Sequence, residues 1–190
     1  MLQEAAASRL DDFFEFLVGE AREDLDGAPE GDSRYPVAAQ MDGRDFARFA
    51  ADVGIGDEVL EPLDVVTGQD WLGFVGIARP SFPIISAEQQ FAEKLHAYTL
   101  PRGERTNTRT KNLVDMVLLV RGKKIEQKNV AAAIRVTFRR RATHEIPQKL
   151  DPPPKDWTLV FDALAKECGL TMKMEQGFEL VREFVGTLRI

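Results

Sequence analysis

The sequence predicts an α+β protein in which strands come first and helices second. Up to Pro83 the apolar residues alternate or form short runs that glycine and proline interrupt, which is typical of strands and loops. Beyond Pro83 the apolar residues recur every three to four positions, which is typical of amphipathic helices. Between two of the strand-like runs, the pair Asp42-Gly43 favours the positive φ angles of a hairpin turn.

The first half of the chain is predicted to hold a short helix and three strands. The helix is expected at residues 2–10, and the strands at 14–18, 35–41 and 45–53. Pro36 has no N–H to donate to a strand ladder, so we expect it at a strand start or on a sheet edge. Residues 20–34 are acidic, rich in Gly and Pro and without periodicity, and therefore predict a loop. Residues 57–83 are predicted to be extended chain that Pro and Gly interrupt.

The second half is predicted to hold five helices. Ser86 and Gln89 match a capping box at the start of the first helix, which buries a stripe of apolar residues. His96 points away from that stripe and is expected on the surface. The later helices are expected at residues 111–120, at 126–140, from an Asp156 cap to Cys168, and around 178–188. We place a domain boundary between residues 1–84 and 85–190, and a stiff proline-rich connector at 147–154.

The composition excludes several classes of protein. With 44% hydrophobic and 29% charged residues, the 190-residue chain resembles an ordinary soluble globular protein. No apolar run approaches the roughly 20 residues of a membrane span, and the N-terminus lacks a secretory pattern. The single cysteine, Cys168, excludes an intrachain disulfide and fits a reducing cytoplasm. Two histidines are too few for a His/Cys zinc site, so any metal would be a hard ion bound by carboxylates.

The charge is distributed unevenly along the chain. Residues 1–101 carry 20 acidic and 7 basic side chains, whereas residues 102–141 carry 12 basic and 3 acidic ones. An acidic half joined to a basic helical segment suits a protein that acts on a polyanion. The alternative is that two parts of one protein attract each other, and the sequence leaves both interpretations open.

Lys94 and Asp115 are the charged residues that depart most from their apolar surroundings. Lys94 lies about 60° around its helix from Phe91, so its stem can follow the core while its ammonium reaches a cleft or water. Asp115 interrupts the apolar run 113–120, where an unpaired buried carboxylate would cost several kcal/mol. It could pair with Lys111 one turn earlier or with Lys94 across two helices. Both a structural ion pair and a working site remain open.

Asp52 is a third candidate because it lies late in a predicted strand. If Val53 faces the core, Asp52 faces the other side of the sheet, where a groove could lie. A magnesium site for phosphoryl transfer needs two or three such carboxylates, of which Asp52 supplies one. No glycine-rich phosphate loop is present, and the adjacent Asp11 and Asp12 would point to opposite faces of a strand.

Basic residues surround the predicted helix that carries Asp115. They bracket it at both ends and are Arg102, Arg105, Arg109, Lys111, Lys123 and Lys124. Such a run is usually a solvated face, but this one flanks Lys94 and Asp115.

These residues occur in a pattern that resembles the AbiEii/AbiGii nucleotidyltransferase toxin family. The segments that carry the resemblance span nearly the whole chain, and are residues 12–14, 51–54, 88–99, 107–115 and 152–157. The resemblance implies a polymerase-β-like nucleotidyltransferase core, here a partial mixed sheet, followed by a helical C-terminal domain. We expect the chain to begin after the Gly-Ser and Asp-x-Asp motifs that bind the metal in this family, because no Gly-Ser followed by an Asp-x-Asp pair is present.

The resemblance also implies roles for particular residues. Lys94 matches the lysine that binds triphosphate oxygens, and Asp115 matches the second acid of a Lys-Asp-x-x-Asp motif whose first acid is here Asn112. Asp52 is similar to the later strand carboxylate and is the one candidate ligand for Mg²⁺. We expect Lys94, Asp115 and Asp52 at the catalytic site, and Lys94, Arg102, Arg109 and Lys111 to bind nucleotide or RNA.

The implied function is that of a toxin in a toxin–antitoxin or abortive-infection system. Such a toxin transfers a nucleotide from a nucleoside triphosphate, with Mg²⁺, to an RNA such as tRNA or to a protein. The expected partners are the triphosphate, an RNA and a cognate antitoxin in the cytoplasm, without a membrane. The alternative is a non-catalytic module that binds RNA or the antitoxin through its basic helices.

Overall fold

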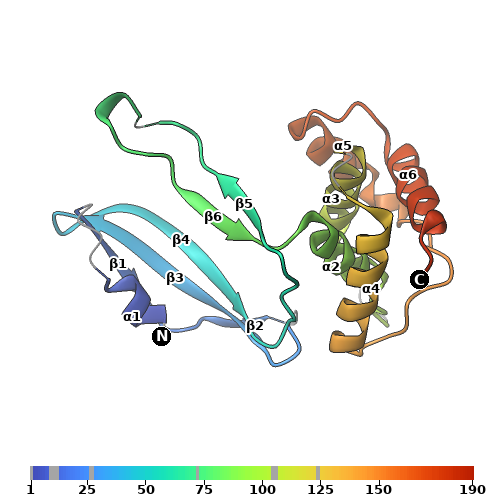
Figure 1. Cartoon of the computed structure of the whole chain (residues 1–190), viewed down its shortest axis with the longest axis horizontal. Helices are drawn as coiled ribbons and strands as arrows, with labels where there is room; N and C mark the ends of the chain where they lie inside the picture. The colour runs from blue at the N-terminus through green and yellow to red at the C-terminus, as the bar shows by residue number, and fades with distance from the viewer. Residues whose placement is uncertain (1, 9–12, 26–27, 72, 104–106, 123–124) are drawn as a thin grey trace. The chain divides into compact units, whose positions relative to one another are not determined.

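The computed structural model describes the chain except for residues 1, 9–12, 26–27, 72, 104–106 and 123–124 (Figure 1). The chain forms two compact units, Met1–Asp57 and Glu58–Ile190. The division lies after Asp57, whereas the sequence suggested a boundary after residue 84. The difference is the segment between them, which belongs to the same unit as the helices.

The N-terminal unit is an antiparallel sheet with one short helix. Its elements are α1 (Leu2–Ala6), β1 (Phe14–Val18), β2 (Glu23–Leu25), β3 (Asp32–Met41) and β4 (Arg44–Gly54). Strand β3 is central, because β1 and β2 pair with it in turn and β4 pairs along its length. Every pair of described strands is antiparallel, so the mixed sheet that the resemblance implied is wrong. The α+β class is confirmed.

The β3–β4 hairpin confirms the predicted turn. Asp42 and Gly43 have φ angles of 50° and 69°, the left-handed values that this dipeptide favours. Pro36 was predicted at a strand start or edge, but it lies inside β3 opposite Ala50. It is tolerated because β1 ends at Val18 before β2 begins, and at this gap the Pro36 carbonyl accepts from the Gly19 N–H at 2.9 Å. The predicted loop at 20–34 is also wrong, since it holds β2 and the start of β3.

The second unit holds a β-hairpin followed by helices. Its elements are β5 (Asp64–Thr67), the 3₁₀ turn η1 (Gly73–Val75), β6 (Ser81–Ile84), α2 (Ala87–Thr99), α3 (Thr110–Arg121), α4 (Gln127–Arg141), the 3₁₀ turn η2 (Lys155–Trp157), α5 (Thr158–Glu167) and α6 (Met174–Thr187). The helices α2 to α6 confirm the five predicted ones. Asp156 does not cap α5 as expected, because it lies in η2 and Trp157 takes the N-cap position.

The hydrophobic core lies among the five helices. Helix α2 packs against α3 and α4, and α3 also packs against α5 and α6. The largest fully buried side chains come from all of them and include Phe91, Leu113, Ile134, Phe161 and Val181. The proline-rich connector is held against this core by buried Leu150 and by the Asp151 carbonyl, which accepts from the Tyr98 hydroxyl at 2.8 Å.

Gly177 on α6 provides a test of this packing. A methyl group on Gly177 would lie 2.8 Å from Phe161 Cζ and 3.2 Å from Val117 Cγ2, and both neighbours are fully buried. We expect Gly177→Ala to lower the free energy of unfolding by about 1–3 kcal/mol, because overpacking outweighs the gain in helix propensity. Gly186→Ala on the same helix is the control, since nothing lies within 4 Å. Equal stability of the two variants in urea denaturation would contradict the packing described.

Candidate functional site

Lys94 and Asp115, the two charged residues that stood out in the sequence, lie side by side in the structure. Lys94 on α2 and Asp115 on α3 form an ion pair, with Nζ 3.0 Å from Oδ2. Of the two pairings that the sequence left open, Asp115 therefore uses the one across two helices. The side chains are 36% and 24% exposed, so a solute can reach the pair from one side. Phe91, Leu95 and Met116, which are close to the pair along the same two helices, are fully buried.

Buried Gln89 fixes the first turn of α2. Its side-chain oxygen accepts from the Leu60 N–H at 2.9 Å, and its amide donates to the Glu58 carbonyl at 2.7 Å and to Glu93 Oε1 at 3.0 Å. The Ser86 hydroxyl caps the helix by accepting from the Gln89 N–H. The predicted capping box is thus half formed, because the Gln89 side chain binds the preceding segment instead. These bonds fix the start of α2, and with it the position of Lys94 along the helical core.

A histidine–threonine cluster holds the other end of α2. His96 is buried, so its predicted surface position is wrong. Its Nε2 lies 2.8 Å from the Thr143 hydroxyl, which is 3.0 Å from His144 Nδ1, and His144 Nε2 is 2.8 Å from the Thr99 hydroxyl. Because the Thr99 hydroxyl donates to the Leu95 carbonyl, it accepts from His144 Nε2. The helical periodicity of the sequence gave no sign that His96 contacts Thr143, which lies in the loop after α4.

The basic residues at the start of α3 are exposed. Arg109 precedes the helix and Lys111 lies in its first turn, both open to solvent. Arg102 is half-buried and donates from Nη2 to the Ala97 carbonyl at 3.2 Å, at the end of α2. The other predicted members, Arg105, Lys123 and Lys124, lie outside the described residues. Asn112, at the position of the first acid in the Lys-Asp-x-x-Asp motif, is buried, and its Nδ2 has no partner among the described residues.

Asp52 belongs to the N-terminal unit, and an arginine binds its carboxylate. Arg34 on β3 donates to both of its carboxylate oxygens, from Nε at 2.7 Å and from Nη2 at 2.8 Å. These hydrogen bonds hold the pKa of the Asp52 carboxyl below its usual value of 3.8. The predicted site residues thus fall in both units, with Lys94 and Asp115 together in the second.

Most of the chain matches a known protein family. The family model described as nucleotidyl transferase AbiEii toxin, type IV TA system, matches residues 1–174. The chain belongs to this family. The resemblance seen in the sequence is therefore confirmed, and the AbiEii match covers the Lys94–Asp115 pair as well as Asp52. A search of the curated proteins found no match.

The Mg²⁺ that the resemblance implied remains a prediction, and its one candidate ligand, Asp52, is bound by an arginine. Among the described residues, no three His, Cys, Asp or Glu side chains gather closely enough to hold a metal ion. Arg34 binds both carboxylate oxygens of Asp52. A metal ion there would have to displace a bidentate guanidinium.

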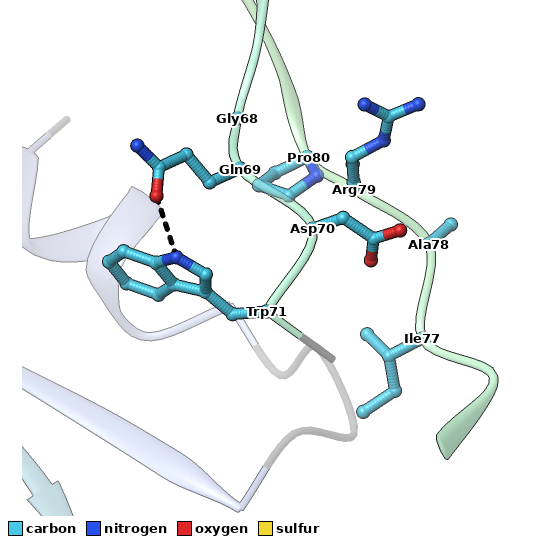
Figure 2. Close-up of a pocket in the computed structure, with 8 residues that line it drawn as sticks. All are labelled: Gly68, Gln69, Asp70, Trp71, Ile77, Ala78, Arg79 and Pro80. Atoms are coloured by element: carbon cyan, nitrogen blue, oxygen red, sulfur yellow. Dashed lines mark hydrogen bonds between the residues drawn. The ribbon is translucent and has the colours of Figure 1, made fainter. Parts of the chain in front are cut away.

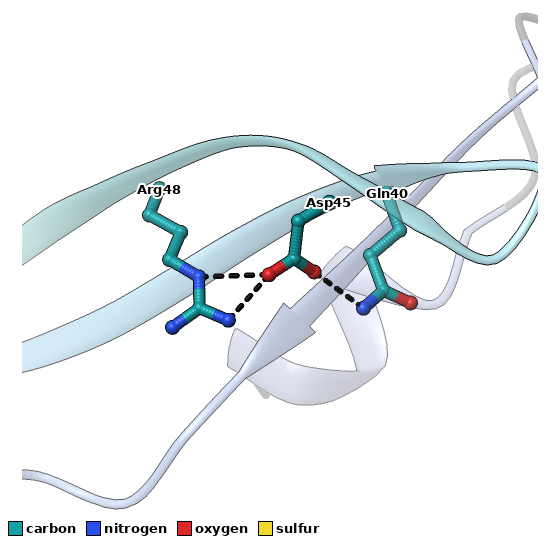
Figure 3. A network of polar contacts seen from close by, with 3 residues as sticks. All are labelled: Gln40, Asp45 and Arg48. Atoms are coloured by element: carbon teal, nitrogen blue, oxygen red, sulfur yellow. Dashed lines mark hydrogen bonds and ion pairs between the residues drawn. The ribbon is translucent and has the colours of Figure 1, made fainter.

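The structure also shows two surface hollows that the sequence did not predict. One, of about 680 Å³, lies on the sheet of the N-terminal unit, where Asp45 accepts from Gln40 at 2.8 Å and from Arg48 (Figure 3). Asp45 and Arg48 would point to opposite faces of a regular strand, but a register shift at Ala39/Gln40 brings them together.

The other hollow lies in the loop that joins β5 to β6. It measures about 480 Å³ and is lined mainly by apolar groups such as Trp71, Ile77 and Pro80, with Asp70 and Arg79 beside them (Figure 2). The Trp71 indole donates to the Gln69 side chain at 2.8 Å.

None of the helices in the described part of the chain is long and apolar enough to cross a membrane.

The histidine–threonine cluster predicts a pH dependence of stability. Burial holds the pKa of His144 below the usual 6.5, so the unfolded chain takes up a proton at a pH where the native chain does not. We expect the contribution of His144 to the free energy of unfolding to be constant above about pH 6.5. It should fall as the pH drops below that value. The measurement is urea denaturation of the protein and of His144→Gln between pH 7.5 and 5.0. A stability difference between the two that does not change with pH would contradict the assignment.

Proposed function

We propose that this AbiEii-family chain binds a nucleoside triphosphate at Lys94 and transfers its nucleotide to an RNA or protein acceptor. In this proposal it is the toxin of a cytoplasmic toxin–antitoxin pair. The observation that carries the proposal is the ion pair between Lys94 and Asp115, which joins α2 to α3 at the rim of the helical core, within the part of the chain that matches the family.

The geometry of the pair suits a site that binds phosphate. An ammonium has three N–H donors, and Asp115 engages one of them at 3.0 Å, which leaves donors for phosphate oxygens. Asp115 acts as a positioning residue, because it directs the ammonium while the lysine stem lies along the apolar core. The exposed cations Arg109 and Lys111 at the start of α3 add positive charge for a triphosphate or an RNA.

A purely structural role explains the pair less well. An ion pair that water can reach contributes only about 0.2–1 kcal/mol to stability. Apolar residues of similar size would serve the packing of α2 against α3 at least as well. A charged pair at this position is therefore better explained by a ligand that uses the charge.

The alternative is a non-catalytic module that binds RNA or an antitoxin. The exposed cations at the start of α3 favour it, because they can contact a polyanion without any nucleotide chemistry. Titration with nucleoside triphosphate separates the two functions, since the module requires no nucleotide binding.

The test is the substitution Lys94→Ala in the full chain. We expect nucleotide affinity to fall roughly 10- to 100-fold, because one charge-assisted contact to phosphate is lost. The free energy of unfolding should change by no more than about 1 kcal/mol. Calorimetric titration with ATP and with GTP, each with and without Mg²⁺, measures the first quantity, and urea denaturation measures the second.

Lys173→Ala is the matched control for this test. Lys173 forms a similar lysine–aspartate ion pair with Asp162, at 2.7 Å, in the same unit. This control should leave nucleotide affinity unchanged. Wild-type protein that binds no nucleotide, or a Lys94→Ala variant that binds as tightly as wild type, would refute the proposed function. A Lys94→Ala variant that unfolds several kcal/mol more easily would show a structural pair instead.

A further inference from the structure

Helix α4 carries five cations and no acid. The cations are Lys128, Arg135, Arg139, Arg140 and Arg141, and Asp and Glu are both missing from Gln127–Arg141. The helix is therefore positively charged, whereas the whole chain has a net charge of −6. An exposed helix in a soluble protein usually mixes the two signs, because opposite charges three or four positions apart stabilise it. Here the charges of the helix can only repel one another.

Three of these cations form a stripe on the solvent face. Lys128, Ala132, Arg135 and Arg139 follow at spacings of four, three and four residues and are all exposed. The opposite face, which includes Val130, Ile134 and Phe138, is buried, and α4 packs against α2. At 1.5 Å per residue the stripe extends over about 16 Å. Small Ala132 in its middle would let a backbone approach closely.

Stabilisation of the helix itself does not explain the stripe. Cations in the last turn of a helix complement its dipole, which accounts for Arg139 and its two neighbours. Lys128 lies in the first turn, where a cation opposes the dipole and an acid is preferred. Arg135 is mid-helix and donates from Nη2 to the Arg189 carbonyl, so a backbone oxygen holds its guanidinium in place.

A shallow groove continues the stripe at the end of α4. It measures about 630 Å³ and is lined by Arg135, Arg139 and His144, with Glu145 as the only acid among its lining residues. The stripe and groove together present guanidinium groups and one ammonium to solvent, and His144 lines the groove with both ring nitrogens hydrogen-bonded to threonines. We call these residues, Lys128, Arg135, Arg139 and His144, the α4 surface.

We propose that the α4 surface binds the phosphate backbone of an RNA, which is the acceptor of the proposed nucleotide transfer. Three of the four residues are cations, and arginine binds phosphate through paired N–H donors. A protein partner would need apolar or aromatic anchors, of which the stripe offers only Ala132 and the groove only Ala142, half-buried Ile146 and the buried Phe138. The inference rests on the proposed function for the identity of the RNA as acceptor, but RNA binding itself does not need Lys94.

The experiment compares two triple variants that remove equal charge. Lys128→Gln/Arg135→Gln/Arg139→Gln changes the α4 surface, and Lys166→Gln/Arg121→Gln/Arg182→Gln changes exposed cations on three other helices. The probe is unfractionated tRNA, titrated by fluorescence anisotropy at several salt concentrations. Circular dichroism and urea denaturation check that both variants fold.

We expect the α4 variant to bind tRNA at least about tenfold more weakly than wild type. The slope of log affinity against log salt concentration should be smaller in magnitude by about 2, because each lost phosphate contact reduces that slope by about 0.7–0.9. The control variant should stay within about twofold of wild type. Equal losses in both variants, no tRNA binding by wild type, or equally tight binding of poly-glutamate would overturn the inference.

Lys94→Ala separates this inference from the proposed function. It should leave tRNA affinity and its salt dependence unchanged while it weakens nucleotide binding. Nucleotide binding without tRNA binding would refute the α4 surface alone. Binding of tRNA through the α4 surface without nucleotide binding would uphold the surface and refute the transferase.

Discussion

The ion pair between Lys94 and Asp115 is the interaction on which the functional account depends. It joins α2 to α3 at the edge of a largely apolar core, with 3.0 Å between Nζ and Oδ2. Complete burial would have made both charges expensive and inaccessible, whereas full exposure would have left them unpositioned. The intermediate exposure of both side chains allows the core to orient the ammonium while solvent, or a phosphate, still reaches it.

Helix α2 is held at both ends, and this fixes Lys94 between them. At its start, buried Gln89 binds the backbone of the preceding segment at Leu60 and Glu58. Near its end, His96 takes part in the histidine–threonine cluster with the loop after α4. The same loop borders the α4 surface, so the element that fixes α2 also lies beside the proposed RNA site. A charged residue on a helix with fixed ends is better placed for binding than one on a mobile loop.

The sequence predicted what depends on local pattern. The apolar period gave the five helices, and Asp42-Gly43 gave the hairpin, because both signals lie within a few residues. Long-range partners were out of reach. The sequence left the partner of Asp115 open, placed His96 on the surface, and gave no sign that Arg34 binds Asp52 across a strand pair. Pro36 was misplaced because its tolerance depends on a gap between two other strands.

A double-mutant cycle on Lys94 and Asp115, measured for both unfolding and nucleotide binding, tests the central claim most directly. The account requires a coupling in the free energy of unfolding below about 1 kcal/mol. It also requires that Asp115→Ala weakens nucleotide binding in wild type but has no further effect once Lys94 is alanine, because Asp115 acts through the lysine. Coupling of several kcal/mol in unfolding, together with unchanged nucleotide affinity in all three variants, would contradict it.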